Sequence, residues 1–177
     1  MLNKSVYLAI ILLLSFRCQD RSSCNRQEIA IPDSSRINSL NNYTEPDRAV
    51  LIDYAKQYMG VKYCSASIDP KVGFDCSGFV WYVFRHFQIE VPRSSGDYKD
   101  LGKSLTPDKF KVGDILVFYG YQDHTSIGHV GIICEADGMK SKFIHASSGK
   151  VNGVTISTLE SDGYRNRFYK CIDVISR

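Results

Sequence analysis

The chain has 177 residues, of which 44% are hydrophobic and 23% are charged. This composition indicates one globular domain with short appendages. Lysine and arginine together number 22 against 19 acidic residues, and no run of basic residues occurs. The charge pattern therefore gives no support for nucleic-acid binding.

The first residues resemble an export signal. Residues 1–17 place Lys4 before an apolar run over Val6–Phe16, and Arg17 and a polar stretch follow. The run of eleven residues is too short for a membrane span, which needs about 20. We therefore expect an exported protein, located in the periplasm or attached to the outer membrane.

Cys18 stands where the signal of a bacterial lipoprotein has its lipidated cysteine, although Arg17 differs from the small residue expected before it. Three outcomes stay open: lipidation of Cys18 as a membrane tether, cleavage to a soluble form, or a retained N-terminal anchor. Residues 18–43 are rich in Ser, Asn, Asp and Arg, which is typical of a linker. The folded domain is expected over 44–177.

Two helices are predicted at the start of this domain. The first is capped near Thr44, and its apolar residues recur at largely helical spacing until Gly60. The second begins near Cys76 with Asp75 as its N-cap and must end before Pro92, after about three turns.

The pattern changes to that of β-strands after Pro107. Turn residues at Asp137-Gly138 and Asn152-Gly153 favour antiparallel hairpins. Helices followed by strands predict an α+β domain with a mostly antiparallel sheet of five or six strands. The strand candidates are Ile115–Tyr119, His129–Cys134, Lys142–Ala146, Val154–Ser157 and Phe168–Ile175.

One hairpin gives a prediction of strand register. If its turn is centred on Asp137, residues whose numbers sum to 274 are opposed, and His129 then faces His145. Opposed residues share a sheet face, with Cβ atoms about 4.5–5.5 Å apart. The two imidazoles are therefore expected on one surface, unless a bulge shifts the register.

Cys76 is the candidate nucleophile because a helix N-terminus stabilises a thiolate through its unpaired N–H groups. Together with a nearby imidazole, this position can lower a cysteine pKa from about 8.5 to about 3.5–7.5. His129 is the candidate base, since Gly128 and Gly131 leave room for a helix to approach, and His145 would orient it. Backbone N–H groups at the helix start, and the phenol of Tyr63, could meet the oxyanion.

Other interpretations of these residues stay open at this stage. Cys76 could be a small buried hydrophobic residue, and His145 a strand histidine bonded to a backbone carbonyl. Cys76, His129 and His145 could instead bind zinc, but no CxxC pair or other local ligand pair supports this. No metal or cofactor is expected, and His86 and His124 receive no role.

Six cysteines in an exported chain suggest disulfides. If Cys76 is the nucleophile and Cys18 is lipidated, four cysteines remain and allow three connectivities. These four are Cys24, Cys64, Cys134 and Cys171.

Five blocks of residues in order resemble the NlpC-type cell-wall peptidases, a group of papain-like cysteine peptidases. The resemblance covers about residues 47 to 175. Any one block is a weak signal, but five in the same order and rough spacing are specific. The blocks are Asp75-Cys76-Ser77-Gly78-Phe79-Val80, Val91-Pro92-Arg93-Ser94-Ser95, Val112-Gly113-Asp114-Ile115-Leu116-Val117-Phe118, His129-Val130-Gly131-Ile132-Ile133 and Phe143-Ile144-His145-Ala146-Ser147-Ser148.

The resemblance implies a papain-like fold and a Cys-His-His triad that hydrolyses peptidoglycan stem peptides through a thioester, commonly between D-γ-glutamate and a diamino acid. By position, Cys76 would be the nucleophile, His129 the base and His145 the orienting residue. Five further residues match positions that line the site or contact the peptide in such proteins: Tyr63, Asp75, Ser77, Arg93 and Ser95.

The loop before the nucleophile departs from the family pattern. The family usually has paired glycines there, whereas this chain has Tyr63-Cys64-Ser65-Ala66-Ser67. Side chains in this loop could narrow the entrance or change the stem peptide that fits. Two rival functions stay open: an amidase or acyltransferase on the same scaffold, and a catalytically inactive domain that binds the cell wall.

Overall fold

The computed structural model describes residues 47–176. The expected export signal (1–17), the lipidation candidate Cys18 and the expected linker (18–43) lie outside the described residues. Within the described part of the chain, no helix has the length and the apolar character that a membrane span requires.

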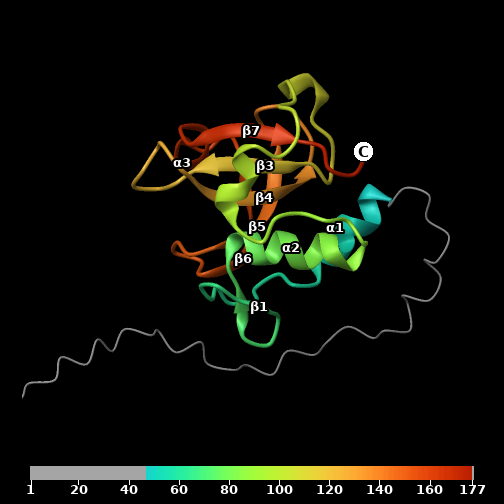
Figure 1. Ribbon diagram of the computed structural model, residues 1–177, viewed down its shortest axis with the longest axis vertical. Coiled ribbons are helices and arrows are strands. Elements are labelled where there is room, and N and C mark those ends of the chain that lie inside the picture. The colour runs from blue at the N-terminus through green and yellow to red at the C-terminus, as the bar shows by residue number, and fades with distance from the viewer. Residues whose placement is uncertain (1–46, 177) are drawn as a thin grey trace, which may run out of the picture.

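The described residues form one five-stranded antiparallel sheet, in the order β6-β5-β4-β3-β7, and a separate pair of short strands, β1 and β2 (Figure 1). This architecture confirms the α+β prediction. The elements are α1 (Arg48–Lys56), β1 (Ile68–Asp69), β2 (Gly73–Phe74), α2 (Cys76–His86), η2 (Ser95–Lys99), η3 (Pro107–Lys109), β3 (Ile115–Tyr119), β4 (Ile127–Glu135), β5 (Lys142–Ser147), β6 (Gly153–Thr158), α3 (Asp162–Arg165) and β7 (Phe168–Ile172).

Both long helices begin at an aspartate cap. Asp47 accepts a hydrogen bond from the N–H of Ala49 at 2.8 Å, and Asp75 accepts one from the N–H of Gly78 at 2.6 Å. Such caps satisfy backbone donors that have no partner within the helix. The predicted start and length of α2 are confirmed, whereas α1 is capped by Asp47 rather than near Thr44 and ends at Lys56 rather than at Gly60.

The sheet separates two hydrophobic layers. Along each strand, alternate side chains point to opposite faces. On one face, Ile132, Ile144 and Ala146 pack with the buried residues of α1 and α2. On the other face, Phe118 and Phe143 belong to a second cluster that Tyr164 of α3 partly covers. Neighbouring residues of one strand therefore enter different layers, as Ile132 and Ile133 of β4 do.

The hairpin register differs from the prediction. The pairs are Ile132 with Ile144 and Ile133 with Phe143, so opposed residues sum to 276 rather than 274, and an irregularity follows between Ile133 and Glu135. His129 is therefore not directly opposite His145. Because the error is two residues, and side chains alternate with a period of two, the predicted sheet face is unchanged.

Strand β7 ends at Ile172, three residues before the predicted Ile175. Asp173 accounts for the difference, because its carboxylate accepts hydrogen bonds from the N–H groups of Ile175 at 2.9 Å and Ser176 at 3.1 Å. A side chain that captures nearby backbone donors in this way favours a turn over a strand.

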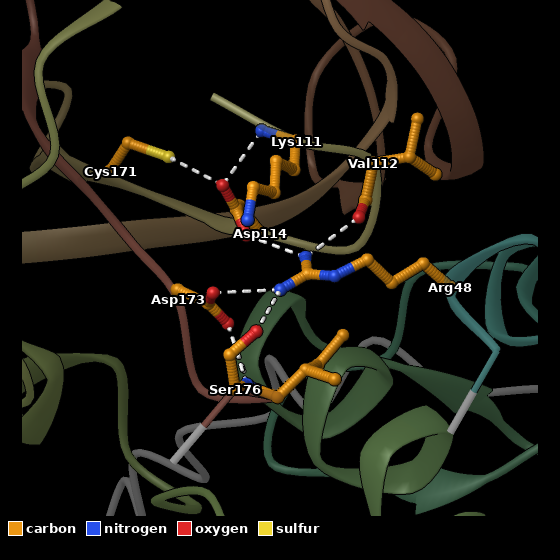
Figure 2. A network of polar contacts seen from close by, with 8 residues as sticks. Arg48, Lys111, Val112, Asp114, Cys171, Asp173 and Ser176 are labelled. Atoms are coloured by element: carbon orange, nitrogen blue, oxygen red, sulfur yellow. Dashed lines mark hydrogen bonds and ion pairs between the residues drawn. The ribbon is translucent and has the colours of Figure 1, made fainter. Parts of the chain in front are cut away.

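Arg48 of α1 joins the helix layer to the end of the sheet (Figure 2). Its guanidinium lies 2.8 Å from the Asp114 carboxylate and 2.7 Å from that of Asp173, and it donates to the carbonyl of Val112 at 2.9 Å. Asp114 is fully buried and also accepts from the N–H of Lys111 at 2.8 Å. A buried carboxylate of this kind needs its partners, because an unpaired buried charge is strongly destabilising.

Candidate active site

Cys76 is the first residue of α2 and is 7% exposed. Its sulfur lies 3.9 Å from the carbonyl oxygen of Gly128, in β4. The backbone N–H of Val130, on the other side of His129, also interacts with the sulfur. The thiol therefore contacts the backbone of Gly128 and Val130, the residues on either side of His129 in β4.

The expectation of a lowered pKa for Cys76 is wrong. Burial, followed by the negative charge of Asp75, raises the pKa of the thiol above its ordinary value. Backbone N–H groups of Val130, Ser77 and Cys76 itself act in the opposite direction but do not outweigh burial. Desolvation disfavours the ionised form of a buried thiol, so the resting group is the neutral thiol.

The two histidines meet, as predicted, on one sheet face. His129 Nε2 and His145 Nδ1 are 2.9 Å apart, and the rings are perpendicular with centroids 4.8 Å apart. Both rings contact Phe118 or Phe143 of the second hydrophobic cluster. The thiol of Cys76 lies against Gly128, the residue that precedes His129 in β4.

The glycines beside His129 have a role different from the predicted one. They were expected to leave room for a helix. A Cβ at Gly128 would instead meet Gly120 of the preceding loop at 2.6 Å, and a Cβ at Gly131 would meet Phe143 at 2.6 Å and His145 at 3.1 Å. Gly131 therefore allows β5, and with it His145, to approach His129.

Burial keeps both imidazoles neutral. It lowers the pKa of His129 well below its ordinary 6.5 and that of His145 to about 4, and the nearby positive charge of Arg167 lowers both further. The adjacent His145 also lowers the pKa of His129. A neutral imidazole can accept a proton, which is what a general base requires.

Three of the predicted substrate-contacting residues form one cluster. Arg93 donates to both oxygens of Asp75, at 2.9 and 2.7 Å, and to the hydroxyl of Ser77 at 3.2 Å. The Ser77 hydroxyl also donates to Asp75 at 3.2 Å. The carboxylate beside the nucleophile is therefore neutralised by a bidentate guanidinium, a strong geometry for such a pair.

Of the other two predicted residues, Tyr63 lies close enough to this cluster for the charges of Asp75 and Arg93 to act on its phenol, whereas no described contact joins Ser95 to the cluster. Tyr63 is half-buried, and burial together with the charges of Cys76 and Asp75 raises its pKa to about 12. Its phenol is therefore a hydrogen-bond donor at any neutral pH. Ser95 begins η2 and is partly exposed, and its hydroxyl makes no hydrogen bond to any described residue.

Sequence reasoning missed the surroundings of His145. Its Nε2 lies 3.0 Å from the hydroxyl of Ser157 in β6 and 3.4 Å from that of Tyr164 in α3. Arg167 donates to the carbonyls of Gly163 and Tyr119 and lies over the ring of Tyr164. The alternation of the predicted strand Val154–Ser157 indicates the face of Ser157, but only the register between β5 and β6 could have placed it near the histidine.

The predicted disulfide sets are wrong. Every connectivity among the four remaining cysteines needs Cys134 and Cys171 in disulfides, but both are free thiols, as is Cys76. Cys134 belongs to the core on the helix side of the sheet and Cys171 to the core on the other side, so the sheet separates them. Cys64 is disulfide-bonded.

The loop that lacks the paired glycines lies directly on the start of α2. A Cβ at Gly78 would overlap the carbonyl oxygen of Ser67. Ala66 has φ of +58°, a left-handed conformation that glycine adopts at lower cost. The chain therefore keeps a glycine-like backbone at Ala66 while carrying an exposed side chain there.

No three metal-binding side chains in residues 47–176 are arranged to hold a metal ion. The zinc alternative for Cys76, His129 and His145 therefore has no geometric support. The site thus combines a His129–His145 pair joined by a hydrogen bond with a thiol that lies against the residue next to His129.

Comparisons with known proteins identify a family. A model of the NlpC/P60 family matches residues 60–173. A Bacillus subtilis protein named gamma-DL-glutamyl hydrolase is 36% identical over 118 residues, which are 66% of this chain and 27% of that protein. An Escherichia coli K12 protein named murein DD-endopeptidase MepS/murein LD-carboxypeptidase is 32% identical over 128 residues, 72% of this chain and 63% of that protein.

The fold also matches solved structures. The crystal structure of an NlpC/P60 family protein from Bacillus cereus superposes with a TM-score of 0.65 and 26% sequence identity, covering 74% of this chain and 41% of the other. This chain thus spans between about a quarter and two thirds of the proteins that it resembles.

Proposed function

Since the chain belongs to the NlpC/P60 family, we propose that it is a cysteine endopeptidase that hydrolyses peptidoglycan stem peptides. In this proposal Cys76 is the nucleophile, His129 the general base and His145 the residue that orients it. The observation that carries the proposal is the thiol of Cys76 against Gly128, beside a His129 that is hydrogen-bonded to His145 at 2.9 Å.

The first half of the reaction forms a thioester. The Cys76 sulfur attacks the carbonyl carbon of the scissile amide while His129 takes the thiol proton. The resulting oxyanion would be stabilised by the backbone N–H groups of Cys76 and Ser77 at the start of α2 and by the phenol of Tyr63. The tetrahedral intermediate then expels the amine, which receives the proton from His129, and leaves the acyl group on the sulfur.

The second half consumes water. His129, neutral again, takes a proton from a water molecule that attacks the thioester carbon. The intermediate collapses to a carboxylic acid, and the proton returns from His129 to the Cys76 sulfur. The directions of the pKa shifts support this sequence, because a neutral thiol and a neutral imidazole can exchange one proton without an ion pair at rest.

The bond proposed to be cut lies between D-γ-glutamate and a diamino acid. The names of two relatives support peptide substrates of this kind, but they specify different bonds, a γ-glutamyl bond in one and a murein DD-peptide bond in the other. The proposal also includes export to the cell envelope, which rests on residues 1–17.

Digestion of defined muropeptides, followed by mass spectrometry of the products, tests the function. We expect a mass gain of one water at the D-γ-glutamyl bond and loss of this activity in Cys76→Ala by at least about 10³-fold. Cys134→Ala removes another buried free thiol and serves as the matched control with near-normal activity.

Other products would point to the rival functions. Cleavage at a bond outside the stem peptide would indicate an amidase, and transfer of the acyl group to an added amine without hydrolysis would indicate an acyltransferase. If the wild-type protein binds muropeptides but changes none of their masses, the chain is a wall-binding domain and the endopeptidase proposal fails.

A further inference from the structure

His145 uses both of its ring nitrogens. Nδ1 lies 2.9 Å from Nε2 of His129, and Nε2 lies 3.0 Å from the Ser157 hydroxyl. The ring is fully buried, and its pKa is lowered to about 4, so it is neutral near pH 7. A neutral imidazole has one N–H donor and one acceptor nitrogen. The partner of Nε2 therefore decides what His145 presents to His129.

The two tautomers of His145 have opposite consequences for the base. If Nε2 carries the proton and donates to Ser157, Nδ1 accepts from the Nε2–H of His129, and His129 Nδ1 is then unprotonated and basic. If Ser157 donates to Nε2, the proton of His145 lies on Nδ1, and Nε2 of His129 must accept. The only proton of a neutral His129 then lies on its Nδ1, which cannot take the thiol proton.

We propose that Ser157 is a positioning residue that fixes His145 in the Nε2–H tautomer, so that His129 keeps a basic nitrogen for Cys76. This inference rests on the proposed function. The Ser157 hydroxyl accepts from His145 in this arrangement, and the chain of hydrogen bonds runs from His129 through His145 to Ser157. The triad thus extends to a fourth residue, on an adjacent strand.

The surroundings of His145 favour this assignment. β5 and β6 pair without interruption from Lys142–Thr158 to Ser147–Gly153, which fixes the backbone of Ser157 relative to His145. The hydroxyl of Tyr164, in α3, lies 3.4 Å from the same Nε2 and is a second, more distant partner. Phe143 and Tyr164 contact the ring and hold its plane. The hydroxyls of Ser157 and Tyr164 are hydrogen-bond partners of Nε2, and a hydroxyl oxygen can accept its proton.

The tautomer can be measured without reference to activity. In protein labelled with ¹⁵N-histidine, long-range ¹H–¹⁵N spectra show which ring nitrogen carries the proton. For the wild-type protein we expect a neutral His145 protonated on Nε2 and a His129 protonated on Nε2. In Ser157→Ala, we expect a mixture of the two tautomers at His145. A wild-type His145 protonated on Nδ1 would overturn the proposal.

Kinetics give the second readout. Ser157→Ala should lower kcat about tenfold with little change in KM, since the substitution acts through His145 rather than on the substrate. Ser157→Thr keeps the hydroxyl and should restore most of the activity. Thr158→Ala removes the hydroxyl of the next residue, which accepts a hydrogen bond from the exposed N–H of Glu160, and should leave kcat and the spectra unchanged.

Tyr164 tests whether the two hydroxyls are interchangeable. Tyr164→Phe alone should cost little, because its oxygen is the more distant partner. The double variant Ser157→Ala/Tyr164→Phe should lose more activity than the product of the two single effects, because Nε2 then has no acceptor. If Ser157→Ala changes neither the tautomer nor kcat, the proposal is wrong. If the spectra agree but the wild-type protein cleaves no stem peptide, the proposed function fails instead.

Discussion

At the scale of single residues, the charge next to the nucleophile is controlled by one guanidinium. Asp75 caps α2 through one oxygen, and both of its oxygens accept from Arg93. The negative charge of Asp75 raises the pKa of the Cys76 thiol. Arg93 therefore counters the negative charge of a capping carboxylate that lies beside the proposed nucleophile.

Removal of this guanidinium should make the thiol harder to ionise. In Arg93→Met the charge of Asp75 is unpaired, and we expect the pH dependence of Cys76 alkylation by iodoacetamide to move to higher pH. The rate at each pH is measured by mass spectrometry of the modified peptide. Arg85→Met, which removes an exposed guanidinium that lies over Trp81 at the end of the same helix, is the control.

A profile of Arg93→Met that superposes on that of the wild-type protein would show that Asp75 does not influence the thiol. Loss of the fold is a separate outcome, which circular dichroism of the same samples would detect. Asp75→Asn would then serve as the second variant, and it should move the profile to lower pH because the negative charge is gone.

At the scale of elements, the sequence predicted the helix that carries Cys76 and the sheet that carries the histidines, because capping and periodicity are local properties. It also predicted the shared face of His129 and His145. It did not predict the register, because the irregularity between Ile133 and Glu135 depends on how β4 and β5 pair. Ser157 was missed for the same reason, since its neighbour lies on another strand.

The distance between β4 and β5 depends on Gly131. A methyl group there would meet Phe143 at 2.6 Å and His145 at 3.1 Å. Gly131→Ala should therefore lower the free energy of unfolding by about 1–3 kcal/mol, as overpacking in a core does, and should reduce kcat by displacing His145. Urea denaturation and peptide cleavage measure the two effects.

Gly163→Ala is the matched control, because nothing lies within 4 Å of a Cβ at that position. It replaces a helical glycine in α3 and should be neutral or slightly stabilising. Equal stability of Gly131→Ala and Gly163→Ala would mean that β5 can move away from β4 at no cost, and that the close approach of the two strands does not position His145.

At the scale of the whole molecule, the site is assembled from two layers. Cys76 comes from α2, and the two histidines come from β4 and β5, so the contact of the thiol with Gly128 of β4 joins the two layers at the site. Arg48 fixes α1 to the ends of β3 and β7 through Asp114 and Asp173 (Figure 2). The relation between the layers therefore depends on contacts that join residues far apart in the chain, which local sequence patterns do not show.

The buried imidazole pair should make the fold sensitive to acid. In the unfolded chain His145 binds a proton at pH about 6.5, whereas in the folded protein its pKa is about 4. Between these values the unfolded state binds more protons, so the free energy of unfolding falls as the pH decreases. For His145 alone, the decrease in the free energy of unfolding approaches about 3 kcal/mol at pH 4, at about 1.4 kcal/mol per pH unit. His129, whose pKa is also lowered, adds to this decrease.

Urea denaturation between pH 8 and pH 4 measures this dependence. Above pH about 7 the two histidines should contribute no slope, because they are neutral in both states. His145→Gln retains a polar side chain and should flatten the curve between pH 6.5 and pH 4, whereas His124→Gln, which changes an exposed loop histidine, should not. A wild-type curve that stays level through this range would mean that the imidazole pair takes up protons within the folded protein, and that the neutral base on which the proposed reaction depends is absent in mild acid.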